Sequence, residues 1–181
     1  MAAAACVGGL LLGAVGCTAA PKSAPPSPTP TVAPIFASDE EALAAATQAY
    51  ANYVSTYDES WADGDGSMAD YLALSVGDAH DNDERSFGEW EAKNWRPTGE
   101  TSFDSVQLQS VTQMDSGTWQ IRTYLCLDAS NGDVVDAAGI SVARPDRQMR
   151  VPLEVAFVTD SPNSALLKIS ESKVWSGTNF C

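Results

Sequence analysis

Residues 38–61 read SDEEALAAATQAYANYVSTYDESW, and this stretch predicts a long helix. Ser38 is followed three residues later by Glu41, which is the pairing of a capping box at a helix N-terminus. Behind it, apolar and aromatic side chains recur at helical spacing: Leu43, Ala46, Tyr50, Tyr53, Val54, Tyr57 and Trp61. We therefore expect an amphipathic helix of about six turns, with its aromatic residues toward the C-terminal end.

Two shorter helical segments follow, after a glycine pair at positions 64 and 66 that predicts the end of the first helix. They are 67–76, SMADYLALSV, which opens with Ser67 and Asp70, and 78–95, DAHDNDERSFGEWEAKNW, which opens with Asp78 and Asp81. In the later segment Phe87 and Trp90 are spaced to face a core. Pro97 predicts the end of the helical half, because proline interrupts helical hydrogen bonding.

The second half of the chain changes to the alternating period of strands. Residues 102–111, SFDSVQLQSV, place Phe103 and Gln107 on one face and Val106 and Leu108 on the other. In residues 118–130, TWQIRTYLCLDAS, one face carries Trp119, Ile121, Thr123, Leu125 and Leu127, whereas Cys126 lies on the opposite face. Asn131-Gly132 predicts a hairpin turn.

Two further strands are expected in the C-terminal part, at 149–158, MRVPLEVAFV, and 165–175, ALLKISESKVW. The first alternates Val151, Leu153, Val155 and Phe157 on one face. Helices followed by a meandering antiparallel sheet indicate the α+β class.

Several motifs together resemble a group of actinobacterial lipoproteins of unknown function with a nuclear transport factor two-like cone fold. They are YLALSVG (71–77), W..KNWRPTGETSF (90–103), YLCLDAS (124–130), VVDAAGISV (134–142), RVPLEVAFV (150–158) and a closing W.G..FC. The resemblance implies N-terminal helices packed on a curved antiparallel sheet and a location outside the cytoplasm. It brings no family catalytic residue.

The first 34 residues predict a secretion signal followed by a membrane anchor and a linker. Residues 1–16 form an uncharged apolar run, which is shorter than the roughly 20 residues of a membrane span and typical of a signal peptide. The run lacks a preceding basic residue, so we expect translation to begin upstream. Ala14-Val15-Gly16 before Cys17 resembles a lipobox, in which the cysteine is diacylated, for example with palmitate. The alternative is an incidental cysteine in an ordinary secretory signal.

Residues 17–34 hold six of the ten prolines and predict an extended linker. This leaves a single domain at 35–181, which we expect to be held at the outer face of the cell membrane by the lipid on Cys17. In an oxidising compartment its two cysteines, Cys126 and Cys181, predict a disulfide, the alternative being two free thiols. With no CxxC pair and no histidine nearby, redox catalysis and a zinc site are not expected.

The formal net charge is −14, and most of it belongs to the helical half. Fourteen carboxylates lie between Asp39 and Glu91 against one base, Arg85. This imbalance argues against nucleic acid and anionic lipid head groups as partners. We interpret it as a solvated helical face, with an acidic ligand site as the alternative.

Six aromatic residues and one aspartate form the candidate pocket between helices and sheet: Tyr50, Tyr53, Tyr57, Trp61, Trp90, Trp95 and Asp128. The alternative is that this aromatic stripe is core. His80 lies in an acidic helix start and is expected on a solvated face, although a catalytic base is the alternative. Asp63, Asp65, Ser67 and Asp70 are spaced like the start of a calcium loop, but Met68 and Leu74 occupy its glycine and glutamate positions, so no metal is expected.

Two functions from different classes follow. The first is a membrane-anchored lipoprotein whose domain binds a small apolar ligand or a cell-envelope protein without a cofactor or chemistry. The alternative is a small cone-fold isomerase, dehydratase or cyclase acting on a hydrophobic molecule. An enzyme requires a buried carboxylate or histidine with a shifted pKa and a tyrosine or asparagine within hydrogen-bond reach. The sequence leaves ligand, partner and oligomeric state open.

Overall fold

A computed structural model describes residues 34–62 and 68–181. The predicted signal peptide 1–16, the lipidated Cys17 and the linker up to residue 33 lie outside the described residues. So do the glycine pair and Ser67 that were expected between the first two helices. The chain divides into Met1–Ala33 and Pro34–Cys181, and the second unit carries every element that the structure describes. In the described residues, no helix is long and apolar enough to cross a membrane.

The helical half consists of α1 (Asp39–Ala62), α2 (Met68–Leu72) and α3 (Gly77–Lys93). The capping box predicted for α1 is present. The backbone N–H of Glu41 donates to Ser38 Oγ at 3.3 Å, and the Glu41 carboxylate accepts the N–H of Ala37 at 2.8 Å.

The start of α3 differs from the prediction, which had placed a cap at Asp78. The helix begins at Gly77, and the residue before it, Val76, makes no side-chain capping hydrogen bond. The Val76 N–H instead donates to the Ile169 carbonyl at 2.9 Å, which holds the chain extended up to this point. The helix ends at Asn94, whose φ of 52° is left-handed, so Pro97 is not what stops it.

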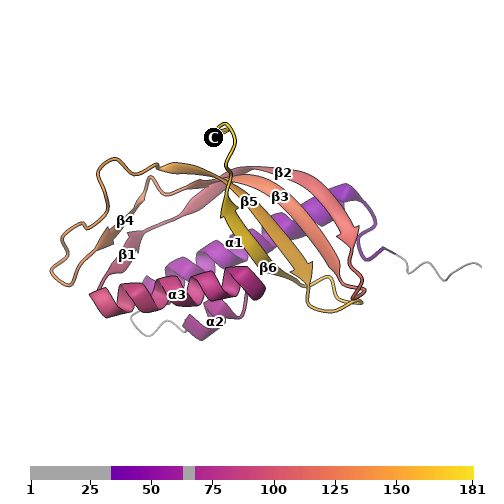
Figure 1. The fold of residues 1–181 in the computed structure, drawn as a ribbon, viewed down its shortest axis with the longest axis horizontal. Helices are drawn as coiled ribbons and strands as arrows, with labels where there is room; N and C mark the ends of the chain where they lie inside the picture. The colour runs from indigo at the N-terminus through magenta and orange to yellow at the C-terminus, as the bar shows by residue number, and fades with distance from the viewer. Residues whose placement is uncertain (1–33, 63–67) are drawn as a thin grey trace, which may run out of the picture. The chain divides into compact units, whose positions relative to one another are not determined.

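The strands form two antiparallel sheets in the described residues. They are β1 (Arg96–Gly99), β2 (Ser102–Gln113), β3 (Trp119–Asp128), β4 (Gly132–Val135), β5 (Arg150–Thr159) and β6 (Leu167–Val174). The larger sheet has the order β2-β3-β5-β6, and β1 pairs with β4 in a separate ribbon. In Figure 1 this ribbon extends beyond one end of the curved larger sheet.

The hairpin predicted at Asn131-Gly132 was wrong in its pairing. The turn is present, with the Gly132 N–H donating to the Ala129 carbonyl at 3.1 Å, but β4 leaves β3 and pairs with β1. A Cβ on Gly99 would lie 2.0 Å from the Asn131 carbonyl oxygen. Glycine at position 99 therefore lets β1 approach the turn closely enough to capture the strand that follows it.

The alternation predicted for the first strand was wrong beyond Phe103. Ser105 has a φ of 55°, and the register of β2 against β3 shifts just after Asp104. This β-bulge inverts the alternation. Phe103, Val106 and Leu108 consequently all pack against the core.

The core lies between α1 and the larger sheet. α1 crosses one face of that sheet, and α3 packs beside it against β6 (Figure 1). The predicted inward faces of β3 and β5 are confirmed, because Ile121, Leu125, Val155 and Phe157 are all fully buried. This helix-on-sheet arrangement is the predicted α+β fold.

The C-terminal segment covers part of the opposite face of the sheet, around Tyr124 and Cys126. Cys181 forms a disulfide with the fully buried Cys126 of β3, which confirms the predicted bridge. The ring of Tyr124 lies 4.8 Å from that of Trp175 and 5.8 Å from that of Phe180. We call residues 175–181 the C-terminal clasp.

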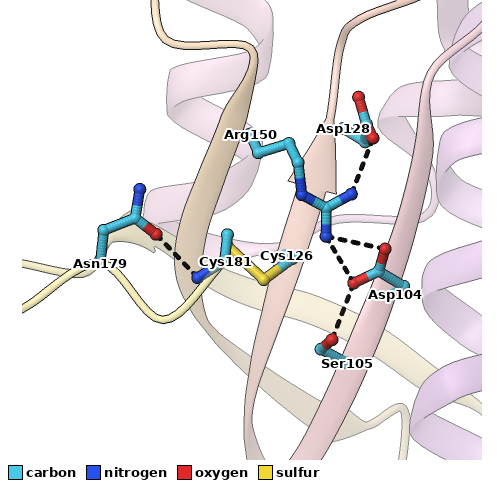
Figure 2. Close-up of a disulfide and its surroundings, with 7 residues drawn as sticks. All are labelled: Asp104, Ser105, Cys126, Asp128, Arg150, Asn179 and Cys181. Carbon is cyan, nitrogen blue, oxygen red and sulfur yellow. Dashed lines mark hydrogen bonds and ion pairs between the residues drawn. A yellow bond between two sulfur atoms is a disulfide. The ribbon is translucent and has the colours of Figure 1, made fainter.

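An ion-pair cluster lies beside the disulfide on this face (Figure 2). The Arg150 guanidinium donates to Asp128 Oδ2 at 2.8 Å and to both carboxylate oxygens of Asp104 at 2.8 Å. Arg150 therefore links β5 to β3 and β2 on the side of the sheet away from α1.

Candidate functional site

A cavity of about 350 Å³ lies between the helices and the β1–β4 ribbon. Its size is within the range of pockets that enclose small molecules. Aromatic side chains from all three helices line it: Tyr50, Tyr53 and Tyr57 from α1, Tyr71 from α2 and Trp90 from α3. Leu127 and Leu153 contribute apolar surface from the sheet, and the ribbon forms the remaining wall.

The structure brings together four residues of the predicted pocket: Tyr50, Tyr53, Tyr57 and Trp90. Trp61 lies next to the cavity and not in its wall. Its ring centroid is 6.1 Å from that of Trp90, and the two share a separate hollow of about 40 Å³.

Two of the predicted pocket residues lie away from the cavity. Trp95 follows α3, and Lys93 Nζ lies 4.6 Å from its ring centroid. Asp128 is on the clasp side of the sheet, where the side-chain hydroxyl and backbone N–H of Ser130 and the Arg150 guanidinium lower the pKa of its carboxyl. The reason is the alternation of β3: Asp128 lies two residues after Cys126 and therefore shares its face, where Arg150 of β5 lies directly opposite it.

The sequence did not reveal Asp58, Tyr71 and Arg147 as residues of this cavity, although all three line it. Tyr71 is carried by a five-residue helix, which is too short to show a periodicity. Arg147 belongs to the segment RPDRQMR (144–150), and the connection after β4 brings it back to the cavity. No residue pattern signals such a return.

A hydrogen-bond network supports the aromatic wall from behind. Asp83 Oδ1 accepts from Tyr53 Oη at 2.7 Å and from Tyr71 Oη at 3.0 Å, and Oδ2 accepts from Ser75 Oγ at 2.8 Å. The single hydroxyl proton of Tyr71 is shared between Asp83 Oδ1 and the hydroxyl of Tyr53. One carboxylate on α3 therefore fixes side chains of α1, α2 and the α2–α3 connection.

Four tyrosines of the wall remain neutral phenols at physiological pH. Burial raises the pKa of Tyr50, Tyr53, Tyr57 and Tyr71, and the nearby negative charge of Asp83 raises each further. The wall consequently offers hydroxyls and ring faces, not phenolate charge.

The charged groups of the cavity belong to α1 and the ribbon side. Asp58 Oδ2 accepts the Thr101 N–H at 3.0 Å, and burial raises the pKa of its carboxyl, to which nearby Glu100 adds. Arg147 donates to the Gly132 carbonyl, and its Nη1 lies 3.6 Å from Asp133 Oδ1.

His80 is not part of this cavity. It is half-buried, and its Nδ1 lies 3.0 Å from the Leu72 carbonyl oxygen at the end of α2. Of the calcium-like residues, Asp70 is described, whereas Asp63, Asp65 and Ser67 lie outside the described residues. Within residues 34–62 and 68–181, no three His, Cys, Asp or Glu side chains are grouped so that they could hold a metal ion.

Solved structures share this fold at low sequence identity. A periplasmic fragment of TraM is 13% identical, with 78% of this chain and 100% of that chain covered at a TM-score of 0.51. The intermembrane space region of the chloroplast protein ARC6 is 11% identical, with 75% and 97% covered at a TM-score of 0.51. Aln2 from a Streptomyces species is 18% identical over 77% and 92%, and its TM-score of 0.40 says nothing about origin or activity.

No family model matches the sequence, and no curated protein resembles it at a significant level. The property shared with these structures is the α+β fold, in which N-terminal helices pack on a curved antiparallel sheet, as the sequence predicted.

Proposed function

We propose that this protein is a lipoprotein anchored by its lipid to the outer face of the cell membrane, and that its domain binds a small, largely apolar molecule in the cavity without converting it. The cavity itself carries this proposal. Its walls combine apolar and aromatic side chains with a few polar groups, which is the usual composition of a small-molecule site. The network on Asp83 holds the wall in place before any ligand arrives.

Native mass spectrometry of the whole chain, purified from its own organism, tests the binding function. We expect a bound small mass on the wild type. Val54 lines the cavity and is buried, so Val54→Phe fills space there and should lose that mass. Val174→Phe is the matched control, because Val174 is 65% exposed on β6 and is not part of the cavity wall. Retention of the mass by Val54→Phe would place the ligand elsewhere.

The anchoring part of the proposal is supported by the residues around Cys17 and by the disulfide. The bridge between Cys126 and Cys181 is the kind of cross-link that persists in an oxidising compartment. Cys17→Ala should move the protein from the membrane fraction to the medium, as followed by immunoblotting. Membrane retention of this variant would contradict the lipid anchor.

A second candidate is the small cone-fold enzyme, and Asp58 is the observation that favours it. This carboxyl lines the cavity and its pKa is raised, as a general base requires. However, the hydrogen-bond partner of Asp58 is Thr101, through its backbone N–H and its side chain, whereas the carboxylate bonded to tyrosines is Asp83, behind the wall. An enzyme site needs a carboxyl with a raised pKa and a tyrosine within hydrogen-bond reach of it. Here Asp58 has the raised pKa, and Asp83 has the tyrosine partners.

Incubating the protein with the molecule that co-purifies with it distinguishes binding from catalysis. The co-purifying molecule is eluted, returned to fresh protein and followed by mass spectrometry. Binding without chemistry predicts an unchanged molecule, and conversion that Asp58→Asn abolishes would establish the enzyme.

A further inference from the structure

The charges that line the cavity do not balance. Three charged side chains belong to its wall: Asp58, Asp133 and Arg147. Arg147 and Asp133 lie within ion-pair distance and offset each other. Asp58 makes no ion pair with any residue in the described ranges, and its hydrogen-bond donors are the backbone N–H and the side-chain hydroxyl of Thr101, which carry no charge. The wall therefore carries one uncompensated negative charge.

A second carboxylate adds to this field from behind the aromatic wall. Asp83 accepts hydrogen bonds from Tyr53, Tyr71 and Ser75, which are all neutral hydroxyls. No lysine or arginine among the described residues forms an ion pair with Asp83. Burial is the main cause of the raised pKa of the Tyr50 phenol, and the negative charge of Asp83 adds to it.

Two further bases, Arg96 and Arg85, do not form ion pairs with these carboxylates in the described residues. Arg96 is exposed and shares a separate hollow of about 130 Å³ with Asp58, outside ion-pair distance. Arg85 on α3 donates to the side-chain oxygen of Asn82 at 2.9 Å. Neither belongs to the wall of the main cavity.

The remaining wall is suited to a positive charge. The faces of tyrosine and tryptophan rings are negative and attract cations, most strongly where water is excluded. Five such rings line the cavity. The formal net charge of −14 further favours the approach of cations over anions.

We propose that the cavity binds an organic cation, an ammonium group on an apolar body, with its charge beside Asp58 and among the rings of Tyr57 and Trp90. This inference rests on the proposed binding function and names its ligand class. The apolar body occupies the surface formed by Leu127 and Leu153.

Three probes with the same six-carbon body test the proposal by isothermal titration of the whole chain at low ionic strength. They are hexyltrimethylammonium, hexanol and hexanoate. We expect the ammonium to bind about tenfold more tightly than hexanol, and hexanoate to bind most weakly.

Asp58→Asn provides the decisive variant. It should weaken hexyltrimethylammonium binding about tenfold and leave hexanol binding unchanged, because only the cation uses the charge. Asp115→Asn is the matched control: it makes the same change in net charge at the β2–β3 turn, at the end of the larger sheet away from the ribbon (Figure 1). It should leave the binding of all three probes as in the wild type.

The outcomes distinguish this inference from the function on which it rests. Equal binding of hexanol and hexyltrimethylammonium would overturn the cation and keep a small-molecule site. Tightest binding of hexanoate would overturn it and assign the polar end of the ligand to Arg147. Absence of binding by all three would overturn both. Should Asp58→Asn fail to fold, the ratio of the three wild-type affinities still decides.

Discussion

The two halves of α1 pack against the same sheet with different results. In the first half Ala42 and Ala46 are fully buried in the core, and their small side chains let the helix approach the sheet closely. In the second half Tyr53 and Tyr57 line the cavity. One helix thus has a filled end and a hollow end, and the change from alanine to tyrosine along it marks the boundary.

Other interactions compensate for the side-chain packing that is missing at the hollow end. The Asp83 network ties its aromatic wall to two further helical segments, and the disulfide braces β3 on the opposite side of the sheet. Leu127, which lines the cavity, is the neighbour of the bridged Cys126 in that strand. The comparison teaches that hydrogen bonds and a cross-link replace packing where a site is kept open.

Phe157→Ala tests the filled end and should have the largest effect. Phe157 is fully buried between β3, β6 and α1, so its removal leaves a cavity that costs about 3–5 kcal/mol of unfolding free energy. Trp90→Ala at the hollow end should cost clearly less, because Trp90 is only half-buried. Denaturant unfolding of both variants measures the difference, and equal losses would contradict the division into two ends.

Cys181→Ser tests the brace behind the hollow end. The bridge closes a loop with a sequence separation of 55 residues, and its loss should lower the unfolding free energy by about 2–4 kcal/mol. Reduced wild type is the control and should unfold at the same denaturant concentration as the variant. A variant as stable as the oxidised wild type would show that the bridge contributes nothing to stability.

Asp83→Asn tests the network behind the wall. Three hydroxyls lose a charged acceptor, and we expect a loss of about 2 kcal/mol in unfolding free energy. Asp81→Asn is the control, since Asp81 is exposed on the same helix and has no recorded side-chain bond among the described residues. Similar stability of the two variants would contradict the bracing role.

Periodicity predicted the filled end better than the hollow one. α1, β3 and β5 each run long enough for their inward faces to show in the sequence, and the capping box at Ser38 marked the helix start correctly. The faces of β2 were predicted wrongly because Ser105 adopts a left-handed conformation without being glycine. The resulting bulge inverts the inward and outward faces of the residues after it. Local patterns contain no information about such an inversion.

The cavity was predicted from one side only. The aromatic spacing on α1 and α3 identified Tyr50, Tyr53, Tyr57 and Trp90. Asp128 was misplaced although the alternation of β3 already puts it, like Cys126, on the face opposite Leu125 and Leu127. Its partner on that face, Arg150, is 22 residues away in the chain. Tertiary contacts bring in the wall residues that belong to short elements and to the long connection after β4. No sequence periodicity predicts these residues.

The smallest effect is expected for Asp58→Asn, and it depends on pH. Burial raises the pKa of this carboxyl in the folded state, so the folded protein binds the proton more tightly than the unfolded chain does. The stability that this protonation contributes is present below the unfolded pKa and is lost as the pH rises through the folded pKa. Relative to the wild type, the asparagine variant should therefore be more stable at neutral pH than at about pH 4.

The magnitude of that difference stays below about 1 kcal/mol, because the carboxylate is half-exposed and solvent screens it. Denaturant unfolding of both proteins at the two pH values measures it, and taking the difference removes the contributions of the other acids. Asp104→Asn should show the opposite sign, since the Arg150 guanidinium lowers the pKa of that carboxyl. Equal pH dependence of the two variants would mean that the charge at the hollow end is already neutralised, and would remove the basis for a cation in the cavity.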